Sequence, residues 1–132
     1  RKFLMYKVEA KQGNIIINKA VIGKIILEAI GQFKGRIWIS NHKGKIVNLK
    51  QRWGTSDGTD YMYIAMGEKG LDVRVNIVIR FGTSIGMVTE QLIHDIKYDI
   101  ERLTGIEANS IAIVVTGLIS KQITRRNIEV KG

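Results

Sequence analysis

The stretch LDVRVNIVIRF, residues 71–81, alternates apolar side chains with mostly polar ones. Successive side chains of a β-strand point to opposite faces of the sheet, so this pattern predicts a strand with one buried face and one face largely in water. The period changes after Ser84, which is a good helix N-cap. The apolar residues that follow at helical spacing are Ile85, Val88, Leu92, Ile96, Ile100 and Leu103. They predict a helix of about 30 Å that packs on the strand and ends at Gly105.

The segments on either side extend this unit. Residues 111–119 form a nearly continuous apolar run, which is typical of a strand in the middle of a sheet covered by a helix. Upstream, Asn18 is a candidate N-cap, and apolar residues at helical spacing predict a helix over residues 19–33, with Gly35 placed to end it. Strands are also expected over residues 3–10, 15–17, 36–40, 45–49 and 61–66, with a turn between residues 66 and 71.

The resulting order, β-β-α-β-β-β-β-α-β, predicts an α+β fold with two helices packed on one face of a mainly antiparallel sheet. A chain of 132 residues is the size of one domain, so residues 1–132 are expected to share a single core. Residues 50–60 contain two glycines and show no periodicity, which predicts a mobile loop.

Composition excludes several classes of function. The chain has no cysteine, and therefore no disulfide, thiolate nucleophile, iron–sulfur cluster or cysteine-bound zinc. No apolar run reaches the roughly 18 residues of a membrane span, because Lys24 and Glu28 interrupt the best candidate. The chain starts at Arg1 rather than at a methionine, so the native N-terminus is expected to be missing. The net charge of +9 leaves an anionic partner open: nucleic acid, lipid headgroups or an anionic polymer.

The basic charge is concentrated in the first half of the chain. Residues 1–66 hold twelve basic and four acidic residues, whereas residues 67–132 hold nine and eight. No acidic residue occurs from Lys34 to Thr55, a segment that includes the predicted hairpin. The candidate residues for binding an anionic partner are Lys34, Arg36, Lys43, Lys45, Lys50, Arg52 and Trp53. Cationic side chains can neutralise phosphates while an indole stacks on bases or lies at a lipid interface.

Two readings of this segment remain open. The segment can dock on an anionic membrane surface, or it can bind single-stranded nucleic acid with Trp53, Tyr61 or Tyr63 as stacking platforms. Trp38 lies between two isoleucines and is also a candidate for the core. The motif of Gly67 and Gly70 resembles the GxxG of KH domains, but here it joins two predicted strands, so a hairpin turn is the expected role.

The sequence gives weaker support for a catalytic site or a metal site. Glu90 and His94 could offer a metal two ligands from adjacent helical turns, but no third ligand has a characteristic spacing, so no metal or cofactor is expected. Gly82, Ser84 and Gly86 satisfy the letters of the Gly-x-Ser-x-Gly nucleophile elbow. The histidine such a triad needs would have to be His94, which lies on the same helix, so the helix-cap role of Ser84 is favoured over a hydrolase.

The ordered set of these segments resembles the alkaline shock protein family of Gram-positive bacteria, whose members act in the envelope stress response. The resemblance rests on KGLDVRVNIVIRFGTSI (residues 69–85), on LTGI at the end of the following helix and on IAIVVTG (residues 111–117). The opening segment GNIIIN (residues 13–18) and the helix after it are similar to the family's first strand and first helix.

The resemblance implies a function without catalysis. We expect a cytoplasmic protein, peripheral at the inner face of the membrane, that acts through protein–protein contacts. The expected partners are further copies of the chain and a membrane-anchored protein, with the basic hairpin favouring an anionic membrane surface. Nucleic acid is the alternative partner, and hydrolysis by Ser84 is a third reading.

Overall fold

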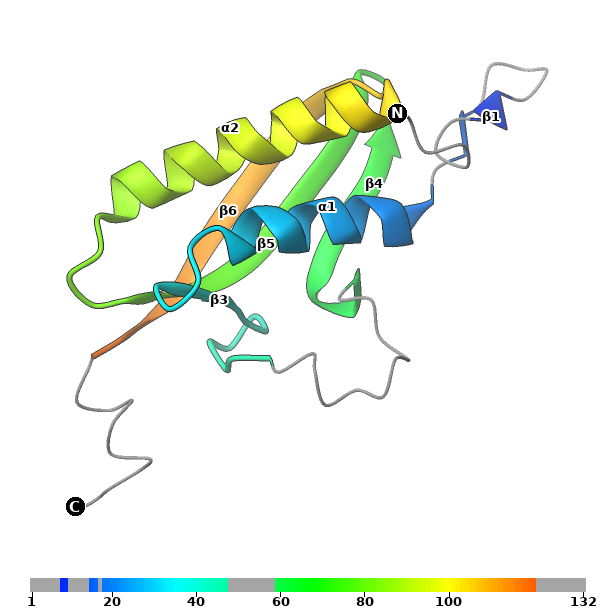
Figure 1. The fold of residues 1–132 in the computed structure, drawn as a ribbon. Helices are drawn as coiled ribbons and strands as arrows, with labels where there is room; N and C mark the ends of the chain where they lie inside the picture. The colour runs from blue at the N-terminus through cyan, green and yellow to red at the C-terminus, as the bar shows by residue number, and fades with distance from the viewer. Residues whose placement is uncertain (1–7, 10–14, 17, 48–58, 121–132) are drawn as a thin grey trace.

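The computed structural model describes residues 8–9, 15–16, 18–47 and 59–120, and these residues form two α-helices, a four-stranded sheet and a separate two-stranded sheet (Figure 1). Its elements follow the predicted order with one strand fewer. They are β1 (Val8–Glu9), β2 (Ile15–Ile16), α1 (Lys19–Gly31), β3 (Ile37–Ile39), the short 3₁₀ helix η2 (Thr59–Tyr61), β4 (Met62–Gly67), β5 (Gly70–Arg80), α2 (Ile85–Thr104) and β6 (Ala108–Ile119). The predicted α+β class, with two helices over a mainly antiparallel sheet, is confirmed.

β5 is the centre of the four-stranded sheet. β4 pairs antiparallel with its first half and β3 with Ile77–Ile79, while β6 runs parallel to it from Leu71 to Arg80. Since β6 pairs with the same β5 residues as β3 and β4 do, it occupies one edge of β5 and the two shorter strands share the other. β6 therefore lies at a sheet edge in the described part of the chain, and the prediction that it lies mid-sheet is wrong. Its apolar run reflects the partial burial of both its faces.

The second arm of the predicted hairpin is not a strand within the described residues. Ser40 and Ile46 form an isolated bridge, and Val47 N–H donates to the Ile39 carbonyl. The Asn41 side chain accepts from both Lys43 N–H and Lys45 N–H, which closes a tight turn in place of a ladder. Residues 48–49 and most of the predicted mobile loop, residues 50–58, lie outside the described residues, as do the outer parts of the two N-terminal strands.

Both helices begin where the sequence predicts. The Asn18 side chain accepts from Ala20 N–H and Val21 N–H at the start of α1, and the Ser84 hydroxyl accepts from Met87 N–H at the start of α2. α2 ends at Gly105, whose φ of 78° is in the left-handed region that glycine tolerates. α1 ends at Gly31, two residues before the predicted Phe33, because residues 32–36 form turns that bring the chain into β3.

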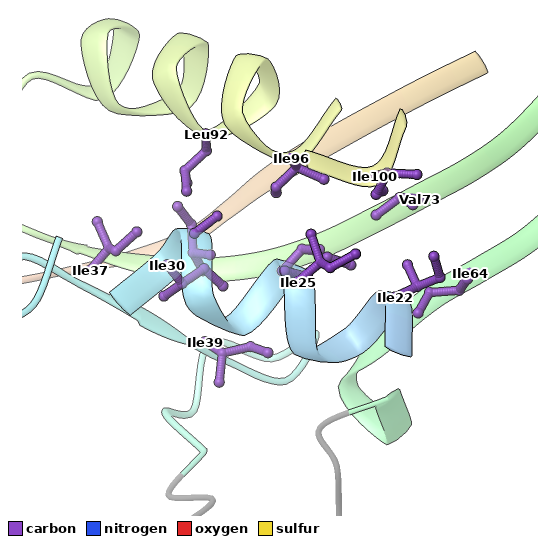
Figure 2. Close-up of a cluster of buried hydrophobic side chains, with 14 of the residues drawn as sticks. Ile22, Ile25, Ile30, Ile37, Ile39, Ile64, Val73, Leu92, Ile96 and Ile100 are labelled. Carbon is purple, nitrogen blue, oxygen red and sulfur yellow. The ribbon is translucent and has the colours of Figure 1, made fainter. Parts of the chain in front are cut away.

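One face of the sheet carries the core (Figure 2). The alternating residues of β5 from Leu71 to Ile79 are at most 1% exposed, as are Leu92, Ile96 and Ile100 of α2 and Ile22 of α1. α1 and α2 lie side by side over this face (Figure 1). We call the opposite face, which includes Trp38, Tyr63 and Arg74, the rear face. The helices thus cover one face of the sheet, and among the described residues no helix covers the rear face.

Candidate functional site

Basic residues from three separate segments lie toward the end of β5. Arg80 N–H donates to the Arg36 carbonyl at 2.8 Å, and the Arg80 guanidinium donates to the Gly35 carbonyl at 3.1 Å. These bonds hold the turn after α1 against the last residue of β5. The Arg36 guanidinium in turn lies 5.7 Å from the centre of the buried Phe33 ring. We define the basic end as Lys34, Arg36, Lys43, Lys45 and Arg80; the first four are exposed and Arg80 is half-buried.

The turn that carries Lys43 and Lys45 is fixed on the rear face near this end. The Ser40 and Thr116 hydroxyl oxygens are 2.6 Å apart, and Thr116 also donates to the Ile77 carbonyl. A Cβ atom on Gly44 would lie 3.0 Å from the Thr116 carbonyl oxygen. The backbone of the turn therefore packs closely on β6, and its two lysines are presented from a defined position.

The charge of the described residues is separated along the sheet. No acidic residue occurs in residues 31–47, 73–89 or 108–120, the segments that build the basic end. The opposite end of the sheet, which we call the far end, holds Glu68, Lys69, Asp72, Lys97, Asp99, Glu101, Arg102 and Glu107. Ion pairs there join Lys97 to Glu101 at 3.0 Å and Arg102 to Asp99 at 3.3 Å. Among the described residues, the basic end has no such pair, so its charge is available to an anionic partner.

Exposed apolar side chains accompany the basic end. Phe81 is 70% exposed, Met87 56%, Leu118 51% and Ile85 45%. Phe81 follows directly after Arg80, and its N–H donates to the Ile119 carbonyl, which brings the ends of β5 and β6 together. The helical spacing predicted Ile85 on the core stripe, which its exposure contradicts, and no pattern in the sequence distinguished Phe81 or Leu118. Phe81 lies past Ile79, the last buried residue of β5, and Ile85 lies before Val88, the first buried residue of α2, so both are beyond the end of the core.

A hollow of about 450 Å³ opens where β3 and β4 meet on the shared edge of β5. Its lining residues are Asn41, His42, Asp60, Tyr61, Met62, Tyr63, Arg74 and Asn76. His42, Tyr63 and Arg74 are exposed. The hollow combines the donors of His42 and Arg74 with the carboxylate of Asp60 and the aromatic face of Tyr63, beside the turn that carries Lys43.

Comparison with protein families assigns residues 7–120 to the alkaline shock protein family, which has a cell envelope-related function. The chain belongs to this family. The match spans both helices and all six strands, so the resemblance seen in the sequence is confirmed. Comparison with curated proteins gave no match, and comparison with solved structures gave none either.

Three of the seven predicted binding residues of this family member, Lys50, Arg52 and Trp53, lie outside the described residues. The other four lie at the basic end, to which the structure adds Arg80. Trp38 is half-buried on the rear face opposite Val78, which is 2% exposed, so the indole is partly committed to packing. Of the helices in the described part of the chain, none is long and apolar enough to span a membrane.

The structure shows a capping role for Ser84 and a ring contact for His94. Ser84 caps α2, as favoured in the sequence. His94 stacks on Tyr98 at a ring distance of 6.3 Å, and the described residues contain no group of three potential metal ligands. Gly67 and Gly70 pair with each other in the β4–β5 turn, as predicted. Gly70 has a φ of 134°, and a Cβ there would lie 2.5 Å from the Glu107 carbonyl oxygen.

One carboxyl at the far end has a shifted pKa. A hydrogen bond from Ala108 N–H and a second from the Lys97 ammonium lower the pKa of Glu101 below its ordinary value of 4.5. Lys97 also donates to the Ala108 carbonyl at 3.1 Å. These contacts fix the last turns of α2 to the first residue of β6, so Glu101 is a structural residue.

Proposed function

We propose that this member of the alkaline shock protein family performs its cell envelope-related function without catalysis, by docking on an anionic membrane surface at the cytoplasmic side. Contacts with a membrane-anchored protein and with further copies of the chain complete its role there. The observation that carries the proposal is the basic end, whose five cationic side chains come from residues 31–47 and 73–89, two described segments without an acidic residue; Asp60 lines the hollow beside the turn that carries Lys43.

The magnitude of the attraction indicates what else docking needs. Each cation near an anionic membrane surface contributes about 1 kcal/mol, so five contribute roughly 5 kcal/mol, which corresponds to a dissociation constant of roughly 0.2 mM. Charge alone therefore gives weak binding. The exposed Phe81 and Met87 can supply the remainder, since aromatic and aliphatic side chains partition into the interface between headgroups and acyl chains. Basic and apolar groups thus support docking together.

Liposome flotation tests the docking. The wild-type chain is expected to float with vesicles that contain phosphatidylglycerol and to stay behind with phosphatidylcholine alone. A variant with Lys34→Glu, Arg36→Glu, Lys43→Glu and Lys45→Glu should lose flotation. The matched control carries Lys19→Glu, Lys24→Glu, Lys69→Glu and Arg102→Glu, which changes the net charge equally at exposed positions away from the basic end. If both variants float equally, the basic end is not the docking site.

Single-stranded nucleic acid is the second candidate partner. The observation that favours it is the hollow, where Tyr63 is 58% exposed beside Arg74 and His42, a combination suited to base stacking and phosphate binding. Titration of a labelled single-stranded RNA at increasing salt separates the two candidates. Log affinity should fall with a slope of roughly −0.7 per neutralised phosphate against log salt if RNA is bound. Absence of binding at low salt removes this candidate.

A further inference from the structure

The outer edge of β6 carries a long row of backbone groups. β6 is twelve residues long, and β5 is the only described strand with which it pairs. A strand at a sheet edge presents N–H and C=O groups that can pair with another strand. At about 3.3 Å per residue, the ten residues from Ser110 to Ile119 extend over roughly 33 Å.

Only the first residue of this edge is capped by α2. Lys97 Nζ donates to the Ala108 carbonyl, and Glu101 Oε2 accepts from Ala108 N–H. Leu71 N–H of β5 donates to the carbonyl of Glu107, the residue before Ala108. The N–H and C=O of Ala108 itself therefore point away from β5 and are bonded by the side chains of α2. No comparable side-chain cap on the outer edge is found in the described residues after Ala108.

The rest of the edge has few of the features by which proteins protect such strands. Those features are charged side chains, prolines, very short length and β-bulges, and from Ser110 onward the edge has only the irregularity at Thr116, where the register with β5 shifts. β6 contains no charged residue and no proline, in a chain with 21 basic and 12 acidic residues. Its side chains after Ser110 are apolar or small apart from Thr116, and Leu118 is 51% exposed. An edge of this kind favours pairing with a further strand.

We propose that the edge of β6 from Ser110 to Ile119 pairs antiparallel with the same edge of a second copy of the chain. The proposal rests on the self-association included in the proposed function and names its surface. A two-fold axis brings identical patches together, and an uncharged strand meets its own copy without placing like charges opposite each other. The two sheets become one continuous sheet, with all four helices on one face.

The flank of α2 above β6 lies toward the second copy under the same axis. Glu90, Ile93, Lys97 and Glu101 recur at helical spacing, and the contacts of Lys97 and Glu101 with Ala108 place this flank over β6. The axis turns the two α2 helices antiparallel, and the flank carries residues of both charge signs, so the approach of the two copies is not opposed by a block of like charge. The two basic ends then lie at opposite tips, and pairing adds nothing to the binding of one membrane.

Sedimentation velocity of the 132-residue chain tests the proposal. The edge variant carries Ala112→Glu and Val114→Glu, which add two carboxylates from each copy to the paired edge, while Arg74, next to Ala112 in register, compensates within one copy. The control carries Tyr63→Glu and Ala65→Glu on β4, on the same face and beside the same arginine. The wild type and the control should sediment as dimers and the edge variant as a monomer, all with native circular dichroism.

Single cysteines locate the contact, because the chain has none of its own. Cysteine introduced at Ser110, Ala112, Val114 or Gly117 should give oxidised dimers with a maximum at one position, since residues opposite each other have Cβ atoms about 5 Å apart. Tyr63→Cys is the background. A dimeric edge variant, or no position above background, overturns the edge proposal but leaves self-association standing. A monomeric wild type overturns both, whereas vesicle docking is judged by flotation alone.

Discussion

The Ser40 hydroxyl lies 2.6 Å from the Thr116 hydroxyl, so the last residue before the basic turn is bonded to a strand 76 residues away in sequence. Ser40 is fully buried, and Thr116 sits at an irregularity in the pairing of β5 and β6. Each hydroxyl also lies within hydrogen-bonding distance of a backbone carbonyl, Ser40 of Asn41 at 3.0 Å and Thr116 of Ile77 at 3.1 Å, so either hydroxyl can donate to the other. This contact determines where Lys43 and Lys45 are presented.

Substitution Ser40→Ala should therefore destabilise the protein. Loss of one partner in a buried hydrogen bond costs about 1–2 kcal/mol, which urea denaturation measures as a change in the free energy of unfolding. Ser110→Ala is the comparison, because the Ser110 hydroxyl bonds the Asp72 carboxylate at an exposed position and should cost under about 0.5 kcal/mol. Equal losses in the two variants would mean that the Ser40 contact is not formed in solution.

Two glycines should respond oppositely to alanine. Gly70→Ala forces a side chain to a φ of 134° and against the Glu107 carbonyl, which should cost about 2 kcal/mol or more. Gly86→Ala lies in the first turn of α2, with nothing within 4 Å of the new Cβ, and should stabilise by roughly 0.5 kcal/mol because alanine favours the helix. Thermal melts of both variants check this; a stabilising Gly70→Ala would contradict the described turn.

Glu101 should contribute to stability in a pH-dependent way. Its folded-state pKa is below the unfolded value, so its stabilisation is fully present above about 4.5 and is lost as the pH falls through the folded pKa. Glu101→Gln should thus lower the free energy of unfolding near neutral pH, and the difference from the wild type should shrink as the pH falls below about 4.5. Chemical denaturation at several pH values measures it. A difference that stays constant down to acid pH would exclude the ion pair as its cause.

Leu92 and Phe81 separate stability from docking. Leu92 is fully buried, so Leu92→Ala should cost about 2–5 kcal/mol. Phe81→Ala should change stability by under about 0.5 kcal/mol, because the ring is 70% exposed. It should nevertheless weaken binding to anionic vesicles up to about tenfold, the equivalent of roughly 1.4 kcal/mol of lost apolar burial. If Phe81→Ala unfolds the protein or leaves vesicle binding unchanged, the ring has no docking role.

Local patterns predicted most of the fold. The alternation in residues 71–81 identified β5 and its buried face, and the caps Asn18 and Ser84 located both helix starts, because these signals lie within a few residues of the structure they determine. The position of β6 was missed for a physical reason. A continuous apolar run indicates that both faces of a strand are buried, but it does not indicate that both edges pair with other strands. β6 is partly buried on both faces and, among the described strands, pairs only with β5.

The basic end was predicted only in part. Lys34, Arg36, Lys43 and Lys45 stood out as a charge run within one segment. Arg80 joins them through its backbone bond to Arg36, a pairing 44 residues apart in sequence that no local pattern reveals. The exposure of Phe81 and Leu118 could not be predicted either. Their apolar character alone predicts burial, and the sequence does not show where the core ends.

Fluorescence of a single environment-sensitive label tests the orientation of docking most directly, since the chain has no cysteine. One sample carries the label at Thr83→Cys, between Phe81 and Ile85 at the basic end. The other carries it at Glu68→Cys, an exposed position at the far end. Loss of the Glu68 carboxylate favours vesicle binding at the far end, so this control is biased against the proposal. Addition of phosphatidylglycerol vesicles should shift the emission of the first label to the blue and leave the second unchanged. A shift at position 68 that equals or exceeds the shift at position 83 would contradict docking through the basic end.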